Sequence, residues 1–398
     1  MKSVFPHILL MLLLVACDLT DTEDANGDYK MEIFQGDEPH VVAGSAVRPE
    51  PGVSVTRDGE PVSGETVRFE VEGDHGMILE DQATTNHNGR AFFDWFMEPD
   101  YLEEHRVTAS YNSQTSEFSA TPVRPDPDSS YFGRSQYIEY QPGTSPIILA
   151  TSHGGDLEPD EIPDRTWGVK VRDLNTRELT LKIADEIEDQ TGDRPHVVIT
   201  HLRRTKLDAN REIEEAAQEN PHAERAWKEY HRWTETAKAI VTEDFGSGFY
   251  VDVHGHGHSI QRLELGYLLR SDDLNQSDSE LDDAGLASSS SIRNLSEEVE
   301  VSLSELLRGE YSLGEIMERE GYPSVPSASD PGPGDNPFFS GGYSTVHHGS
   351  RDGGTIDGVQ LEANFDDVRD TEENRQEFAE SFSRGLIQFL NRYAAMDL

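Results

Sequence analysis

Apolar and polar residues alternate along much of the first third of the chain. The stretch 53–73 reads VSVTRDGEPVSGETVRFEVEG and contains two turn pairs, Asp-Gly and Ser-Gly. On either side of these turns, every second residue is apolar. The stretch 83–96 repeats this scheme around an Asn-Gly pair, and HRVTASY (105–111) adds another alternating segment. Short alternating strands with tight turns are typical of an antiparallel β-sandwich. The pattern therefore predicts an all-β sandwich over residues 30–122.

The pattern changes after residue 133, where compact apolar runs alternate with segments of helical periodicity. The run SPIILATS (145–152) is typical of a buried strand, and residues 374–393 carry apolar side chains on one helical face. This alternation predicts an α/β domain over 134–398, with a mixed, mostly parallel sheet flanked by helices. The other predicted elements are helices at 179–193 and 208–243 and strands at 196–202 and 249–253.

Two polar segments accompany these domains. Residues 123–133 are rich in proline and aspartate and are interpreted as a linker between the two domains. Residues 271–292, SDDLNQSDSELDDAGLASSSSI, are rich in serine and acids. Because helical and strand patterns resume after residue 292, this second segment is predicted to be a surface loop within the α/β domain.

The first seventeen residues, MKSVFPHILLMLLLVAC, have the pattern of an export signal. A lysine precedes an apolar run that is too short to span a bilayer. Cys17, the only cysteine, follows Leu-Val-Ala and resembles the acylated cysteine of bacterial lipoproteins; an ordinary signal peptide is the alternative. We expect an exported protein, lipid-anchored to the periplasmic or surface side of the cell envelope, without disulfides or transmembrane helices. Residues 18–29 would form its polar tether.

The charge balance is strongly acidic and excludes one class of partner. The chain has 77 Asp and Glu against 33 Lys and Arg, a formal net charge of -44. The acids are spread along the whole length, which indicates a solvated acidic surface. Such a surface repels phosphates, so no nucleic-acid partner is expected. It is typical of a halophilic protein, because high salt screens the self-repulsion.

The predicted β-sandwich contains no cluster of titratable groups. Its arrangement PV-x-G-x-x-V-x-F, followed by T-x-x-x-G-x-A, resembles the bacterial immunoglobulin-like domains of surface proteins. The resemblance implies a spacer or docking role for residues 30–122, and any chemistry is expected in the second domain.

Histidines follow two of the predicted strands of that second domain. His153 comes directly after SPIILATS, and His254 begins HGHGH after FYVDV. Ligands of open α/β sheets bind at the carboxyl ends of strands, and two histidines with one carboxylate are a catalytic zinc ligand set. Glu158 follows His153 closely, and two glycines between them allow a tight turn. Alternatively, His254, His256 and His258 could bind the ion without the carboxylate.

Five motifs in order resemble a known enzyme family. They are HGGDLEP (153–159), HLRRTKLDANR (201–211), VDVHGHGH (251–258), GGYSTVHHG (341–349) and GVQLEA (358–363). Together they resemble the N-formylglutamate amidohydrolases and the related poly-γ-glutamate hydrolases, over residues 134–398. The family implies a zinc carboxypeptidase-like fold, one zinc ion per chain and hydrolysis of an amide bond.

The resemblance assigns roles to particular residues. His153, Glu158 and His254 would bind zinc, and Glu362 would be the general base. The pattern alone favours a charge at a strand edge for Glu362, and the resemblance reverses this interpretation.

The substrate side of the site is expected to be cationic. Asn210 and Arg211 would bind a substrate carboxylate, with Arg203 as a second candidate. Asn210 and Arg211 could instead be a solvated pair at a helix start. His256 and His348 could support the site from outside the ligand set, stabilise the transition state or serve the fold alone.

The sequence therefore supports two hypotheses of different classes. The first is a zinc-dependent hydrolase that cleaves a C–N amide bond in a small acidic N-acyl-glutamate or γ-glutamyl substrate. The second is a cell-surface binding lipoprotein that has the metal site but does not hydrolyse its ligand. The acyl group, the chain length of the substrate and the oligomeric state are left open.

Overall fold

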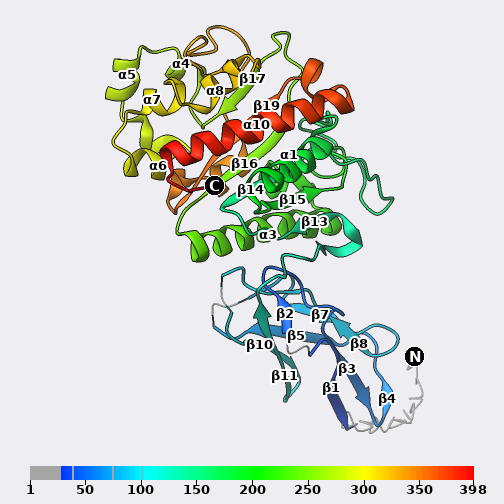
Figure 1. Cartoon of the computed structure of the whole chain (residues 1–398). Coiled ribbons are helices and arrows are strands. Elements are labelled where there is room, and N and C mark those ends of the chain that lie inside the picture. Colours follow the sequence, from blue (N-terminus) through cyan, green and yellow to red (C-terminus); the bar gives the residue numbers. More distant parts are fainter. Residues whose placement is uncertain (1–27, 38–39, 74–75, 101) are drawn as a thin grey trace, which may run out of the picture.

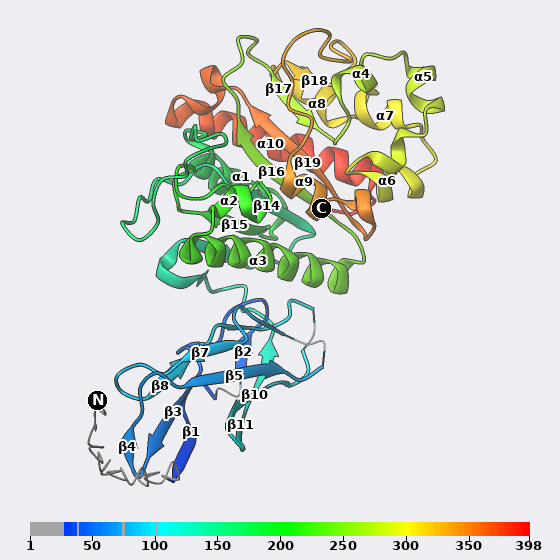
Figure 2. The same cartoon turned by 180° about the vertical axis from the view of Figure 1, so that it is seen from behind.

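The computed structural model describes residues 28–37, 40–73, 76–100 and 102–398. The predicted signal segment 1–17, its Cys17 and nearly all of the predicted tether lie outside the described residues. A β-rich part precedes a larger part in which helices surround a sheet (Figures 1 and 2). Among the described helices, none is long and apolar enough to cross a membrane.

The β-rich part contains three small sheets. One sheet has the strands β1 (Tyr29–Gln35), β3 (Gly52–Arg57), β4 (Glu60–Pro61) and β8 (Arg90–Phe92). A second has β2 (His40–Val42), β11 (Gln114–Val123), β10 (His105–Tyr111), β5 (Thr66–Val71) and β7 (Gln82–Thr84). The third pairs β6 (Met77–Ile78) with β9 (Trp95–Phe96). Of these pairings only that of β2 with β11 is parallel, so the part is predominantly antiparallel.

The side chains that alternate along these strands form one apolar core. In β10, every second residue is buried, as the alternation in HRVTASY predicts. Phe93 lies at the centre, with its ring 4.2 Å from that of Phe69 and 5.2 Å from that of Phe118. Such aromatic pairs stabilise a core beyond the area that they bury.

The larger part is built on an eight-stranded mixed sheet. Its order is β12-β13-β15-β14-β16-β19-β17-β18, and the neighbours among β15, β14, β16 and β19 run parallel. The strands are β12 (Tyr131–Phe132), β13 (Ile138–Gln141), β14 (Ile147–Thr151), β15 (His196–Thr200), β16 (Gly248–Gly255), β17 (Leu263–Gly266), β18 (Ser324–Val325) and β19 (Ile356–Ala363). Strand β12 lies inside the segment that was predicted to be a linker, so the sheet begins earlier than the sequence indicated.

Helices cover both faces of this sheet. The longest are α1 (Thr176–Thr191), α3 (Pro221–Phe245) and α10 (Glu372–Tyr393). Helices α1 and α10 pack on one face and α3 on the other (Figures 1 and 2). The remaining helices are α2 (Ile213–Ala217), α4 (Ser271–Leu274), α5 (Asp278–Asp283), α6 (Arg293–Glu298), α7 (Leu303–Arg308), α8 (Leu313–Arg319) and α9 (Tyr343–His348), with short turns η1 (Arg134–Gln136), η2 (Leu286–Ser289), η3 (Ser350–Asp352) and η4 (Phe365–Arg369).

The structure differs from two of the sequence predictions. The helix expected over 208–243 is divided into α2 and α3, because Asn220 caps a new helix whose first residue is Pro221. The segment 271–292, expected as a loop, contains two helices and a helical turn. Helix α5 begins there because Ser277 accepts a hydrogen bond from the Glu280 amide and the Glu280 carboxylate accepts one in return.

The central parallel strands are fully buried, as their continuous apolar runs predict. Alternate residues of β14 face the two helical layers: Ile147 and Leu149 lie in the core with α1 and α10, whereas Ile148 and Ala150 face α3. Parallel strands bring their carboxyl ends to one edge of the sheet. The carboxyl ends of β14, β15, β16 and β19 and the segments that follow them therefore meet there, and together they carry the residues of the candidate site.

A buried charge cluster joins the β-rich part to α3. Arg225 of α3 contacts Asp94 of the β-rich part, and its Nε lies 3.3 Å from Glu229 on the same helix. Arg48 reaches Glu229 from the β-rich part at 3.7 Å. Arg225 and Glu229 are almost wholly buried. Buried charges require partners, so this cluster fixes the contact between the two parts.

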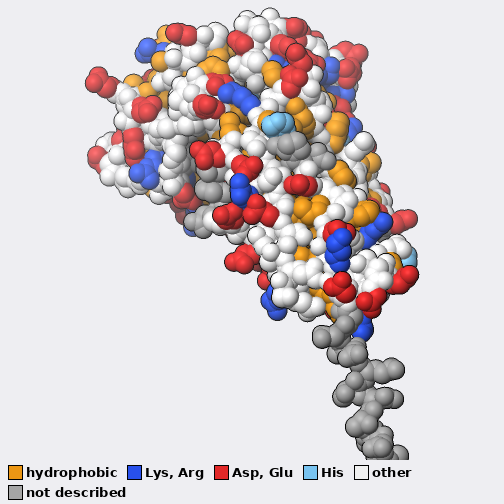
Figure 3. Space-filling view, turned by 90° about the horizontal axis from the view of Figure 1, so that it is seen from below, with side chains coloured by type: hydrophobic (Ala, Val, Ile, Leu, Met, Phe, Trp, Pro, Cys, Tyr) orange, Lys and Arg blue, Asp and Glu red, His pale blue; other side chains and the backbone are white. Residues whose placement is uncertain are grey.

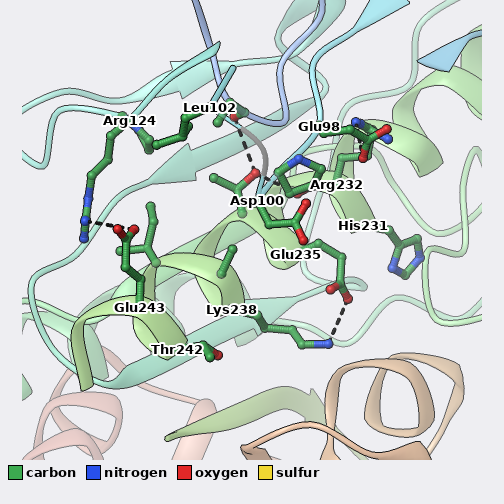
Figure 4. A pocket seen from close by; sticks show the side chains of 16 residues that line it. Glu98, Asp100, Leu102, Arg124, His231, Arg232, Glu235, Lys238, Thr242 and Glu243 are labelled. Carbon is green, nitrogen blue, oxygen red and sulfur yellow. Dashed lines mark hydrogen bonds and ion pairs between the residues drawn. The ribbon is translucent and has the colours of Figure 1, made fainter. Parts of the chain in front are cut away.

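A hollow of about 850 Å³ lies beside this contact. Figure 4 shows that α3 supplies one wall, with Arg232, Glu235 and Lys238, and that the β-rich part and the following segment supply the other. The charged side chains of the hollow pair with one another: Lys238 lies 2.9 Å from Glu235, and Arg232 lies 3.4 Å from Glu98. The hollow is therefore a feature of the contact between the two parts. Elsewhere the acidic side chains are scattered, as on the face in Figure 3.

Candidate metal centre

Two histidines and one aspartate converge at the carboxyl edge of the sheet. Nδ1 of His153 lies 3.3 Å from Oδ2 of Asp173, and Nδ1 of His254 lies 3.2 Å from the same oxygen. All three side chains are buried. Tetrahedral zinc with bonds of 2.0–2.1 Å separates its ligand atoms by ~3.4 Å. By donor type and by the two distances to Asp173, this group could hold a metal ion such as zinc.

Each histidine has a carboxylate beside its other ring nitrogen. Oδ1 of Asp208 lies 2.6 Å from Nε2 of His153. Oδ1 of Asp252 lies 3.0 Å from Nε2 of His254, at ion-pair distance but without the angles of a hydrogen bond. Carboxylates in these positions orient metal-binding histidines and raise their basicity. Asp208 and Asp252 therefore each lie beside Nε2 of one histidine, and Nδ1 of both histidines is directed to Asp173.

The electrostatic field at this point favours positive charge. Burial alone would lower the pKa of His254, but Asp252 and Asp173 raise it well above its usual range. Burial would raise the pKa of Asp173, but His153 and His254 hold it well below its usual range. A field that stabilises a proton on His254 also stabilises a bound cation.

The loop after β14 brings Asp173 back to His153. The Asp173 amide donates to the His153 carbonyl at 3.2 Å, and Arg172 donates to the Gly154 carbonyl from Nε and from a terminal guanidinium nitrogen. Gly155 packs so closely that a Cβ would lie 2.4 Å from backbone atoms of His201. Gly155 of HGG thus permits a close approach of backbone segments, whereas the sequence had indicated a turn that brings Glu158 to His153.

The structure does not bring Glu158 to the two histidines. Residue 157 forms a parallel bridge with residue 202, and this bridge leaves Glu158 at the surface. Its carboxylate pairs with Arg203 at 3.0 Å, and the two side chains are 48% and 43% exposed. Asp173 occupies the place that was expected for Glu158. The sequence signal for Asp173 was weak, because it is one of many acids and precedes a helix rather than following a strand.

Glu362 lies beside the histidine and aspartate group. In the parallel pairing of β16 with β19 it is opposite His254, and in the antiparallel pairing of β19 with β17 it is opposite Glu264. Its carboxylate is buried and accepts a hydrogen bond of 2.9 Å from Gln360. Burial raises the pKa of Glu362 to about 8; His254 acts in the opposite direction, and Asp173 and other carboxylates add to the rise. Such a carboxylate readily holds a proton near neutral pH.

Asn210 lies in the site, and Arg211 lies at its border. The Asn210 side chain is buried, with Nδ2 3.2 Å from Nε2 of His254 and Oδ1 accepting from the Ser344 amide. Arg211 donates to the Asn210 carbonyl at 2.7 Å, and one third of its side chain is exposed. Arg203 is directed to Glu158 at the surface. Of the three residues expected to bind substrate, Asn210 thus contacts the metal group and Arg211 adjoins it.

His348 belongs to a different network. Its Nδ1 lies 2.9 Å from Glu235 of α3, and its Nε2 lies 2.9 Å from Nδ1 of His231. His231 in turn bonds the carbonyl of Ala209, next to Asn210. Burial lowers the pKa of His348, although Glu235 opposes this shift. The arrangement ties α9 to α3 and supports the loop that carries Asn210.

Arg369 is a residue that the sequence analysis missed. It donates to the carbonyls of Ala363 and His256, each at 3.0 Å, and to that of Leu174. It thereby holds together the segments that carry Glu362, His254 and Asp173. A Cβ at Gly255 would lie 2.2 Å from its guanidinium carbon, so the first glycine of HGHGH makes room for it. The local sequence Val368-Arg369-Asp370 contains no pattern that would predict this role for the arginine.

Comparisons with known proteins add little to this picture. No protein family model and no curated protein matches the chain. Among solved structures, the gene product Atu2144 from Agrobacterium tumefaciens is 14% identical over 63% of this chain and 94% of that one, with a TM-score of 0.36. The D00-D0 domain of Intimin is 17% identical over 24% of this chain, with a TM-score of 0.20.

These likenesses are too weak to establish a shared fold. The chain spans about half of the length of the Intimin fragment, 46%. The D0-D1 domain of Intimin gives a similar result, 15% identity and a TM-score of 0.20 over 30% of this chain and 56% of that one. The mixed α/β architecture and the β-rich first part therefore rest on the strand pairing of this chain itself.

Proposed function

We propose that the protein is a zinc-dependent hydrolase of C–N amide bonds, related to the N-formylglutamate amidohydrolases that its five motifs resemble. The observation that carries the proposal is the convergence of His153, Asp173 and His254, with Glu362 opposite His254 on the next strand. Two histidines and a carboxylate leave the fourth zinc position open for chemistry. The proposed ligand set thus replaces Glu158 by Asp173 and retains the zinc carboxypeptidase-like assignment.

Glu362 would be the general base and then the general acid. Zinc, when bound at this point, would polarise the scissile carbonyl and lower the pKa of a water molecule. Glu362 would remove a proton from the attacking water molecule while the water oxygen forms a bond to the carbonyl carbon. The same carboxyl group would then donate that proton to the amide nitrogen as the C–N bond breaks. The products are a carboxylic acid and an amine, and Glu362 returns to its initial state.

The proposed substrate is a small acidic amide of the N-acyl-glutamate or γ-glutamyl type. Arg211 would bind its carboxylate, because its partly exposed guanidinium group lies beside Asn210, which contacts His254. Asn210 would act mainly by holding His254, since its amide contacts that ring and the Ser344 amide. Both arginines have an acidic partner, Glu215 at 3.6 Å from Arg211 and Glu158 at 3.0 Å from Arg203. Arg203 is the weaker candidate, because it lies at the surface with Glu158 and, within the described part of the chain, has no hydrogen bond or ion pair with Asn210 or the histidines.

The location of the enzyme is part of the same proposal. Acylation of Cys17 would hold the mature chain to the cell envelope, and the β-rich part would separate the catalytic part from the lipid. An external enzyme would meet N-acylated or γ-linked glutamate in peptides or polymers.

The test combines metal content with turnover. The full chain, purified in detergent, would be incubated with a panel of N-acyl-glutamates and γ-glutamyl peptides, with and without a chelator. We expect chelator-sensitive cleavage that Glu362→Gln abolishes while zinc stays bound; Glu158→Gln is the matched control. Zinc binding without turnover of any panel member would contradict the hydrolase and favour the surface binding protein.

A further inference from the structure

A second group of possible metal ligands lies next to the first. His256, His258 and Glu264 place ring nitrogens and a carboxylate oxygen within 4.8 Å of one another. His256 and Glu264 are buried, and one fifth of the His258 side chain is exposed. Of the histidines in HGHGH, the first therefore belongs to the centre described above and the other two to this group.

The hydrogen bonds of His256 leave its Nδ1 as the ligand nitrogen. Its Nε2 lies 2.8 Å from the Arg262 carbonyl, which can only accept, so Nε2 carries the proton. The unprotonated Nδ1 accepts a hydrogen bond from the His258 amide at 3.1 Å, and a bound metal ion would replace this bond. A metal-binding histidine usually donates its other N–H to a carbonyl or a carboxylate in this way. The ring is therefore already in the tautomer that binding through Nδ1 requires.

Glu264 supplies the carboxylate of the group. Its Oε1 lies 2.8 Å from Nδ1 of His258, and its Oε2 accepts from the Phe339 amide at 2.8 Å. The side chain is 1% exposed. A buried carboxylate needs a cationic partner or a proton, and a ligating carboxylate usually accepts a hydrogen bond on its free oxygen. The Phe339 amide provides that bond and leaves Oε1 directed at His258.

A stacking contact with an aromatic side chain holds the His258 ring. The ring stacks on that of Phe339, with centroids 4.7 Å apart and planes inclined by 13°. Gly257, between the two histidines, has no atom within 4 Å of the position of a Cβ, so this part of the loop is not tightly packed. Small rotations of the partly exposed His258 side chain could therefore open its 2.8 Å contact with Glu264 to the spacing of two metal ligands.

We propose that His256 Nδ1, His258 Nδ1 and Glu264 Oε1 form a second site for a divalent first-row transition-metal ion. Two imidazoles and a carboxylate suit zinc and related ions, and they discriminate against calcium and magnesium, which prefer oxygen ligands. The two sites share the loop 254–258. Glu362 lies between them, because its cross-strand neighbours are His254 on one side and Glu264 on the other. This inference goes beyond the proposed hydrolase and does not require it.

Zinc stoichiometry tests the proposal. The full chain would be stripped with a chelator, dialysed against zinc chloride and assayed by elemental analysis. We expect two zinc ions in the natural chain, one in His258→Ala, one in His153→Ala and none in the double variant. His87→Ala, at an exposed histidine of the β-rich part, is the matched control and should retain two.

Two further measurements keep the test decisive. Circular dichroism would show that His258→Ala is folded, and His258→Gln would replace it if it is not. Cobalt(II) titration should give two absorption steps in the natural chain and one in the His258 variant. A single zinc per chain that His153→Ala removes and His258→Ala leaves in place would overturn the second site. Two ions with no amide turnover would preserve it and contradict the hydrolase instead.

Discussion

Glu362 on β19 is the direct neighbour of His254 on β16 in a parallel register. Since paired residues of adjacent strands project to the same face, the buried carboxyl group and the imidazole are held together by the sheet itself. Substitution of Glu362 by glutamine should preserve the shape of the site and remove only the proton transfer. We expect kcat to fall by about 10²–10⁴-fold, the usual contribution of a general base. Steady-state kinetics with matched zinc analysis measures the effect, and unchanged turnover would exclude Glu362 as the base.

The identity of the third ligand is open to a direct comparison. Asp173→Asn should weaken zinc binding by more than about 100-fold, because it removes a charged donor on which both histidines converge. Glu158→Gln should leave the zinc affinity unchanged, because the Glu158 carboxylate pairs with Arg203 at the surface. Competition with a chromophoric chelator gives both affinities. The reverse result would restore the ligand set that the sequence first indicated.

The partner of His153 provides a milder perturbation of the same centre. Asp208 is fully buried, with Oδ1 2.6 Å from Nε2 of His153 and Oδ2 accepting from Arg204 at 2.9 Å. Asp208→Asn should lower zinc affinity by about 10–100-fold, the usual effect of losing such an outer partner. The loss should be smaller than that in Asp173→Asn. Equal losses in the two variants would indicate that Asp208 is itself a ligand.

Stability should depend on pH through Asp357. Burial raises the pKa of Asp357 to about 6, although Ser350, the Leu295 amide and Asn294 donate hydrogen bonds to it. The unfolded carboxyl group has its ordinary pKa of 3.8. Between these values the folded Asp357 carboxyl group binds more protons than the unfolded one, so its contribution to the free energy of unfolding falls as the pH rises from about 4 to 6.

The size of this effect is at most about 3 kcal/mol, from a shift of roughly two pKa units. Asp357→Asn should remove this part of the pH dependence, whereas Asp335→Asn, at an exposed position, should leave it in place. Denaturant unfolding of the metal-free chain at several pH values gives the slopes. A slope that persists in Asp357→Asn would assign the dependence to another group.

The charge cluster between the two parts should make them unfold together. Arg225→Ala leaves Asp94 and Glu229 without their buried cation. Removal of one partner of a buried ion pair usually costs about 3–5 kcal/mol. We expect the single calorimetric transition of the natural chain to divide in two, with the β-rich part melting first. Lys30→Ala removes an exposed ion pair and should leave one transition, as its 64% exposed side chain indicates.

The sequence predicts the architecture better than the ligand set, for a physical reason. Strands such as 145–152 and the helix at 374–393 are encoded by local periodicity, and the structure has β14 and α10 at these places. His153 could be found because it follows the buried strand β14, and His254 because it lies at the carboxyl end of the buried strand β16. Asp173 could not, since its position depends on a loop that folds back through backbone hydrogen bonds. The hydrogen bonds given for Arg369 likewise go to carbonyl groups, which any sequence supplies.

The bonds of Arg369 also bear on how the chain folds. Asn175 donates to the Arg369 carbonyl across 194 residues of sequence, and Arg369 donates to Leu174 across 195. Contacts of such long range form late, because the loop that they close is long. The segment directly after Asp173 is therefore expected to take its final place once the C-terminal segment of the chain has arrived. A nascent or partly translocated chain would have the histidines but no assembled centre, so metal capture should follow folding rather than guide it.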